Sequence, residues 1–254
     1  MKPLAALTKR AVIAVVTLGI VLVVLVLVAW PSMALWRAKR QAMAQYAGSQ
    51  DYALLNTVPA DEVRHLEADP SEGERVSTTL ESYRYSLPAD AYILLPQKST
   101  YVDFESDVLK VRILGTGPLT SEFRKRPMAP TEVTDYFTKT DPWQIVVDAF
   151  NARPDDISRQ KTQAALDKHR LLLLLKATLA PIGMDTHWEN VDTGRYRGNV
   201  AGDTSLGGIT VMLYLPETQD FANIVLFPTD GATMTDVYDA LANLRIEPTT
   251  TASA

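Results

Sequence analysis

The chain has 254 residues, no cysteine and a formal net charge of −5 at pH 7. Without cysteine it has no disulfide, no thiolate nucleophile and no Cys-based zinc site. Residues 1–40 contain six Lys and Arg and no acid, which leaves 19 basic and 30 acidic residues, a net charge of −11, for the remainder. Because an acidic domain repels phosphate backbones, we expect no nucleic-acid partner.

A stretch of twenty uncharged residues runs from Ala11 to Trp30. At about 1.5 Å per residue, a helix of this length reaches roughly 30 Å, the thickness of the hydrocarbon core of a bilayer. The sequence therefore predicts a transmembrane helix over residues 11–30, preceded by a short tail over residues 1–10. A cleaved export signal is the alternative, because Ser32 and Ala34 place small residues where a signal peptidase would cut.

Both flanks of this stretch carry three Lys or Arg residues, so charge alone gives little indication of orientation. The short N-terminal tail, with its charges beside the apolar run, favours an N-terminus inside and a large domain outside the cytoplasm. We expect a single-pass protein of a bacterial inner membrane, with the lipid bilayer as the partner of residues 11–30. The residues expected at the membrane interface are Trp30, Trp36, Arg37, Lys39 and Arg40.

Three segments are expected beyond residue 30: a helical stalk over 31–50, one domain over 51–247, and a disordered tail over 248–254. A split of the domain near Pro127–Pro130 into two lobes is the alternative. The first element of the domain is a short helix over residues 59–68, because Pro59 suits a first helical turn. Three strand-rich segments follow, each rich in β-branched or aromatic residues and bounded by turn residues: 75–87, 91–96 and 106–115.

The middle of the chain has the pattern of helices. Asp141 is the expected N-cap of a helix that begins at Pro142, and a longer helix is expected from about residue 156 to residue 180. Residues 207–215 and 221–227 alternate in polarity around a five-residue connection and predict a β-hairpin. Thr233 is the expected N-cap of the last helix, with Asp236 three residues later.

This order of elements predicts an α+β fold, with a mainly antiparallel sheet and packed helices after the N-terminal transmembrane helix. Strands joined by short turns and helices grouped in blocks are typical of that class. The aromatic residues of the strand-rich segments are expected in the core, and an exposed aromatic face that binds a partner or a glycan is the alternative. These residues are Tyr83, Tyr85, Tyr92, Tyr101 and Phe104.

One polar constellation stands out in the sequence. Asp185, His187 and Glu189 are spaced by two, so on a strand they would project from one face and could bind a metal or shuttle a proton. A solvated strand face is the structural alternative. Ser158 and Lys161 match the S-x-x-K pattern, but the S-D-N and K-T-G companions of that pattern are missing. No catalytic residue and no cofactor is assigned from the sequence.

The layout of anchor, stalk and acidic domain, without a catalytic motif, indicates a membrane-anchored, non-catalytic domain of the cell envelope. We expect this domain to bind another protein outside the cytoplasm. The first alternative is a membrane-tethered hydrolase or a metal-binding protein that uses Asp185, His187 and Glu189. The second alternative is a periplasmic immunity-type inhibitor, steered to a basic toxin by its acidic charge.

Overall fold

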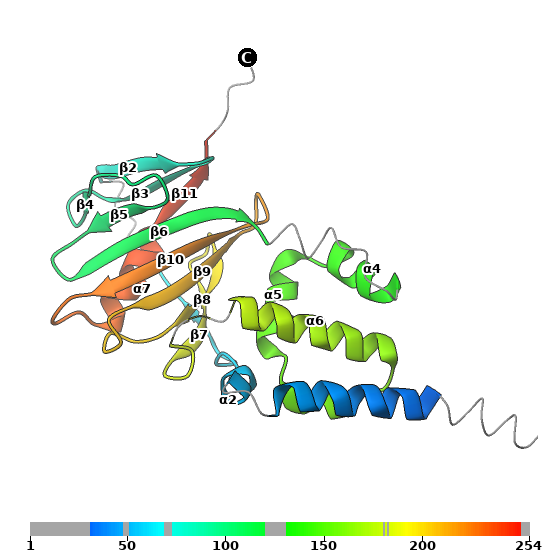
Figure 1. The fold of residues 1–254 in the computed structure, drawn as a ribbon. Coiled ribbons are helices and arrows are strands. Elements are labelled where there is room, and N and C mark those ends of the chain that lie inside the picture. Colours follow the sequence, from blue (N-terminus) through cyan, green and yellow to red (C-terminus); the bar gives the residue numbers. More distant parts are fainter. Residues whose placement is uncertain are drawn as a thin grey trace, which may run out of the picture.

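The computed structural model describes residues 31–47, 51–68, 73–119, 131–179, 181 and 183–249. Two sheets and several helices form this part of the chain, so the α+β class is confirmed (Figure 1). The larger sheet has the strand order β1-β7-β8-β9-β10-β6-β5-β4, and only β1 and β7 pair in parallel. Its strands are β1 (Val63–His65), β4 (Ile93–Leu94), β5 (Val102–Glu105), β6 (Leu109–Pro118), β7 (Trp188–Asp192), β8 (Arg197–Ala201), β9 (Ile209–Leu215) and β10 (Asp220–Pro228).

The smaller sheet is antiparallel and has the order β11-β3-β2. Its strands are β2 (Arg75–Leu80), β3 (Tyr83–Pro88) and β11 (Arg245–Pro248). Strands β2 and β3 form a hairpin around Glu81, whose φ of 56° is in the left-handed region. Strand β11 follows the last helix, and the sequence pattern did not predict it.

Each face of the larger sheet covers a separate core (Figure 1). On one face the sheet packs against the smaller sheet and α7 (Met234–Asn243), and this core contains Tyr83, Tyr85 and Phe104. On the other face lie a helix over residues 31–46 and further helical elements. These elements are α2 (Asp51–Asn56), α4 (Thr131–Lys139), α5 (Pro142–Asn151), the 3-10 helix η1 (Pro154–Arg159) and α6 (Gln163–Leu179).

Several predicted elements are confirmed by the structure. The side chain of Asp141 caps α5 by accepting hydrogen bonds from two backbone N–H groups of its first turn. Thr233 and Asp236 form a reciprocal capping box at the start of α7. The predicted β9–β10 hairpin forms, but β10 begins at Asp220, which pairs with Leu215, so the connection is one residue shorter than the five expected.

Two predicted helices are corrected. Helix α2 ends at Asn56, and residues 63–65, expected to be helical, form β1 instead. The N–H of Leu66 bonds to the carbonyl of Asp192 at 2.8 Å, so pairing with β7 outweighs the local helical signal. The long helix expected from residue 156 begins at Gln163, because η1 occupies residues 154–159 and the Thr162 hydroxyl accepts the N–H of Ala165.

The transmembrane part of the predicted fold is also corrected. In the part of the chain that the structure describes, no helix combines the length and the apolar character that a bilayer crossing needs. Helix α6 has 17 residues and is interrupted by the charges of Lys168, Arg170 and Lys176. The single-pass architecture, the inner-membrane location and the position outside the cytoplasm are therefore withdrawn. The stretch 11–30, on which they were based, lies outside the described residues.

The helix over residues 31–46 packs against the second core, where Ala42 is buried. The Nζ atom of Lys39 donates a hydrogen bond to the carbonyl of Ser158 at 2.9 Å, which ties this helix to η1. Trp36 is 58% exposed and Arg40 lies over its ring, with Cζ 5.5 Å from the centroid. The role at lipid headgroups that was predicted for Trp36, Arg37, Lys39 and Arg40 is withdrawn together with the transmembrane helix, and Trp30 lies outside the described residues.

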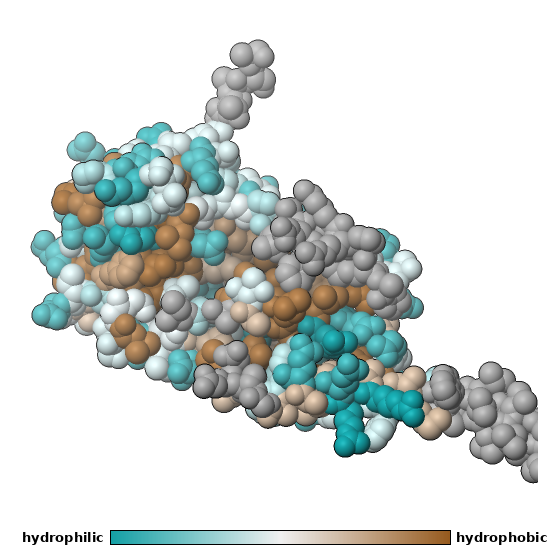
Figure 2. Space-filling model, viewed as in Figure 1, coloured by the Kyte–Doolittle hydropathy of each residue, from teal (hydrophilic) through white to brown (hydrophobic). Residues whose placement is uncertain are grey.

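Strand β6 contains a bulge that turns an apolar side chain outward. Asn223 pairs with Gly115 and Ile224 pairs with Ile113, so Leu114 has no partner in the register and is exposed. Gly115 has a φ of 140°, which favours glycine at this bend. In the view of Figure 2, hydrophilic residues gather over the smaller sheet and over the helix spanning residues 31–46, and hydrophobic residues show between them.

Candidate functional site

The structure brings together two of the three residues expected to bind a metal. Glu189 is buried on β7, and His187 precedes this strand with Nε2 at 3.2 Å from Oε1 of Glu189. Asp185 is exposed in the preceding turn, and no hydrogen bond or ion pair links its side chain to another described residue. Among the residues that the structure describes, no group of three or more His, Cys, Asp or Glu side chains is arranged to hold a metal. The metal site thus stays a prediction.

Glu189 is the centre of a polar cluster that we call the Glu189 network, which consists of Glu189, Arg64, His187 and Tyr238. Nε of Arg64 donates to Oε2 of Glu189 at 3.0 Å, and the hydroxyl of Tyr238 donates to Oε1. The guanidinium of Arg64 also lies over the Tyr238 ring, 4.6 Å from its centroid. Burial raises the pKa of Glu189, but the hydrogen bonds from Tyr238 and Arg64 and the nearby His187 lower it more, so this pKa lies below its ordinary value.

A buried lysine lies in the helical part of the molecule. Lys176 is fully buried, and its Nζ donates to the carbonyls of Leu55 at 2.8 Å, Thr57 at 2.6 Å and Ala152 at 2.9 Å. Burial, together with the charge of Arg153, lowers the pKa of Lys176 to about 7. Because all three donor positions are occupied by backbone carbonyls, this lysine joins α6 to the ends of α2 and α5 and is not available to a ligand.

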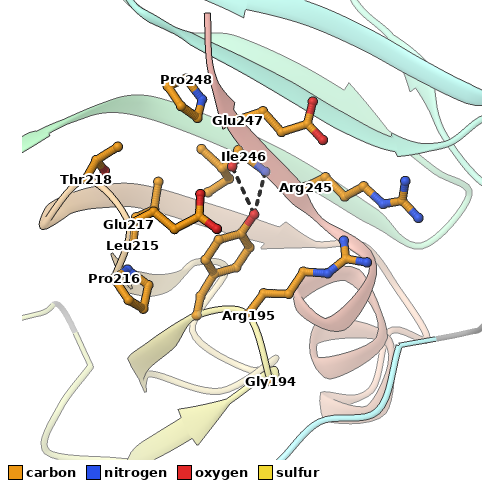
Figure 3. Close-up of a pocket in the computed structure, with 11 residues that line it drawn as sticks. Gly194, Arg195, Leu215, Pro216, Glu217, Thr218, Arg245, Ile246, Glu247 and Pro248 are labelled. Atoms are coloured by element: carbon orange, nitrogen blue, oxygen red, sulfur yellow. Dashed lines mark hydrogen bonds between the residues drawn. The ribbon is translucent and has the colours of Figure 1, made fainter.

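A cavity of about 540 Å³ opens where two hairpin turns of the larger sheet meet β11 of the smaller sheet (Figure 3). Residues 194–196 of the β7–β8 turn, 215–218 of the β9–β10 turn and 245–248 of β11 line it, and we call it the arginine pocket. The β7–β8 turn is held by local bonds: the N–H of Gly194 bonds to the Asp192 side chain at 2.7 Å. Gly194 has a φ of 76°, a value that this turn needs and glycine accommodates.

Tyr196 fixes the inner wall of the arginine pocket. Its hydroxyl donates to the carbonyl of Ile246 at 3.0 Å and accepts the N–H of the same residue at 2.8 Å (Figure 3). Burial raises the pKa of Tyr196, so the hydroxyl keeps its proton. In an antiparallel sheet both backbone groups of such a residue would bond to a neighbouring strand. Tyr196 therefore occupies the free edge of β11 and closes it to a further strand.

Two arginines line the pocket and form no ion pair within the described residues. The side chains of Arg195 and Arg245 take part in no ion pair and no hydrogen bond with the rest of the described chain, and in Figure 3 their guanidinium groups lie on the same side of the pocket. Behind them, Arg75 bonds to Ser86 and to the carbonyl of Asn243. Burial lowers the pKa of Arg75, and the charges of Arg245 and Arg195 lower it further. The nearby charge of Glu247 raises the pKa of Arg75 in part, so Arg75 lies among charges of both signs.

A second cavity is lined by acidic residues without a basic one. A volume of about 800 Å³ between β4, β5 and α7 is lined by five carboxylates and by no Lys or Arg: Asp90, Glu105, Asp107, Asp236 and Asp239. The arginine pocket, by contrast, contains two arginines that form no ion pair in the described structure. This contrast makes it the candidate binding site.

No motif in the sequence predicts the arginine pocket. Its two arginines, Arg195 and Arg245, are fifty positions apart, and only the meeting of the two sheets brings them together. The sequence contained one local signal for this site: Gly194 predicts a turn, and Arg195 is the next residue. Ser158, of the S-x-x-K pattern, donates to the carbonyl of Asp155 at 3.2 Å within η1.

Comparison with known proteins gives no relative: no family model, no curated protein and no solved structure matches this chain. The functional conclusion therefore depends on the geometry of the pocket.

Proposed function

We propose that this chain is a non-catalytic domain that binds another protein, and that the arginine pocket receives an acidic side chain of this partner. The observation that carries the proposal is the pair of arginines, Arg195 and Arg245, that line one cavity and form no ion pair in the described structure. A guanidinium presents its N–H donors in a planar fork that matches a carboxylate. The closed edge of β11 supports recognition by side chains and not by addition of a strand.

The polar groups outside the pocket support a binding role over a catalytic one. Glu189 already accepts hydrogen bonds from Arg64 and Tyr238, and Lys176 already donates to three carbonyls, so neither is poised to act as a base or a nucleophile. Nucleic acid is a poor fit because Glu217 and Glu247 stand at the same pocket as the arginines and repel a polyanion.

The test is a titration of the full-length chain with the blocked peptide acetyl-Gly-Glu-Gly-amide, followed by NMR of the arginine side-chain Nε–H groups. We expect saturable shifts at Arg195 and Arg245. We expect none with the matched peptide that has Gln in place of Glu. In the double variant Arg195→Gln/Arg245→Gln, which lacks these two signals, we expect the Glu peptide to cause no saturable shift of the backbone N–H groups of Gly194 and Tyr196. The control is Arg159→Gln, an exposed arginine of η1 outside the pocket, which should bind as the unchanged chain does. Equal shifts with the Gln peptide, or no saturation, would overturn the proposal.

A further inference from the structure

The arginine pocket contains two carboxylates as well as two guanidinium groups. Glu217 and Glu247 are exposed and line the same cavity as Arg195 and Arg245. Within the described part of the chain, none of these four side chains forms an ion pair or a hydrogen bond with another side chain. Four charges of both signs therefore share one cavity without neutralising one another.

The four charges come from three parts of the fold. Arg195 is on the β7–β8 turn and Glu217 is on the β9–β10 turn, whereas Arg245 and Glu247 are two residues apart on β11. In Figure 3 the guanidinium groups of the two arginines lie on one side of the pocket with the carboxylate of Glu247 above them, and the carboxylate of Glu217 lies on the other side. Burial is the main cause of the raised pKa of Tyr196; the charge of Arg195 lowers this pKa, and the charges of Glu247 and Glu217 raise it.

We infer that the ligand of the arginine pocket is a zwitterionic segment of a partner protein, with a carboxylate side chain for Arg195 and Arg245 and an ammonium side chain for Glu217 and Glu247. A simple anion would bind the two arginines but more weakly, because of the repulsion of the two glutamates, and a simple cation would be weakened by the two arginines. A segment with both charges satisfies all four groups. This inference rests on the proposed function and specifies the chemistry of the same site.

The remaining walls of the pocket fit a short peptide segment. Leu215, Pro216 and Pro248 supply apolar surface between the charged groups, and a cavity of about 540 Å³ has the size of sites that enclose small ligands. Because Tyr196 already bonds to both backbone groups of Ile246, the segment is selected by its side chains and not by pairing with β11.

The experiment uses isothermal titration calorimetry on the full-length chain with two blocked pentapeptides. The first is acetyl-Gly-Glu-Gly-Lys-Gly-amide, and the second has norleucine in place of Lys and therefore lacks only the ammonium. We expect the Lys peptide to bind about tenfold more tightly, the effect of one charge-assisted hydrogen bond. In the double variant Glu217→Gln/Glu247→Gln we expect this advantage to disappear, while the norleucine peptide binds as well as before or better. Both glutamates are exposed, so the variant should fold, and a thermal scan checks this.

The outcomes separate the two proposals. Equal binding of both peptides to the unchanged chain would overturn the zwitterion inference and leave the carboxylate site intact. Absence of binding by either peptide would overturn the proposed function itself. Free glutamate serves as a further probe: if it bound as tightly as the Lys peptide, the site would be one for a free amino acid and not for a segment of a partner protein.

Discussion

The Glu189 network and the arginine pocket both contain arginine and glutamate side chains, but these are paired in the network and unpaired in the pocket. In the network, Glu189 is buried and is bonded to Arg64 and Tyr238. In the pocket, Arg195 and Arg245 line a cavity with Glu217 and Glu247, and none of them is paired in the described structure. The network contributes to stability, and the pocket leaves its charges free for a ligand.

The difference shows that burial decides whether a charged side chain must be paired. A buried carboxylate has to be paired, because an unpaired charge in the interior costs several kcal/mol. An exposed arginine has no such requirement, since water solvates it, and so it can be kept for recognition. The comparison therefore predicts that loss of Glu189 is costly to folding and that loss of the pocket arginines is not.

The largest expected effect comes from Glu189→Ala. The substitution leaves the Tyr238 hydroxyl and the Arg64 guanidinium without their acceptor, and we expect the free energy of unfolding to fall by about 3 kcal/mol. Urea denaturation at pH 7 measures it. Because the network lowers the pKa of Glu189 below its ordinary value, its contribution is present above pH 4.5 and is lost as the pH falls below that value.

The matched control for this prediction is Glu217→Ala, which removes an exposed glutamate of the pocket. Its free energy of unfolding should stay within about 0.5 kcal/mol of the original, as for most surface substitutions. If both substitutions cost the same, the contrast between paired and free charges would be wrong.

Lys176 is the intermediate case, a buried cation held by carbonyl dipoles without a carboxylate. Its pKa is lowered from 10.5 to about 7, so between these values the unfolded chain binds more protons than the folded one. Stability therefore rises with pH across this window, by about 2 kcal/mol from pH 7 to pH 9. Urea denaturation at several pH values measures the slope.

Two variants identify the source of this slope. In Lys176→Met the rise should disappear, whatever the absolute stability of the variant, and in Lys161→Met, which changes an exposed lysine, it should remain. A slope that survives in Lys176→Met would assign the titration to another group.

Much of the fold follows from local signals in the sequence, and the failures have a common cause. The caps at Asp141 and Thr233 and the hairpin of β9 and β10 depend on residues a few positions apart, so a linear pattern contains them. Residues 63–65 were expected to be helical, and a linear pattern could not show that they form β1, because the pairing of β1 with β7 joins residues more than a hundred positions apart. Strand β11 was missed for the same reason, since it has four residues and is defined only by its partner β3.

The candidate site depends entirely on such distant pairings. A spacing of two placed His187 and Glu189 close together, as a strand requires, but it gave no indication that Arg64 and Tyr238 would occupy the carboxylate. The arginine pocket needs two turns and a strand from different sheets, so no pattern of neighbouring residues predicts it. Net charge was also misleading, because an acidic average conceals a local cluster of unpaired arginines.

The smallest expected effect, and the sharpest test of the comparison, is the stability of Arg195→Gln/Arg245→Gln. Both side chains lack a partner in the described structure, and Arg75 behind them is destabilised by their charge. We therefore expect the free energy of unfolding to change by no more than about 0.5 kcal/mol. Any change should be toward greater stability at low ionic strength and should vanish in concentrated salt, because it arises from relief of like-charge repulsion. A loss of stability comparable to that of Glu189→Ala would mean that these arginines hold the fold together and are not free for a ligand.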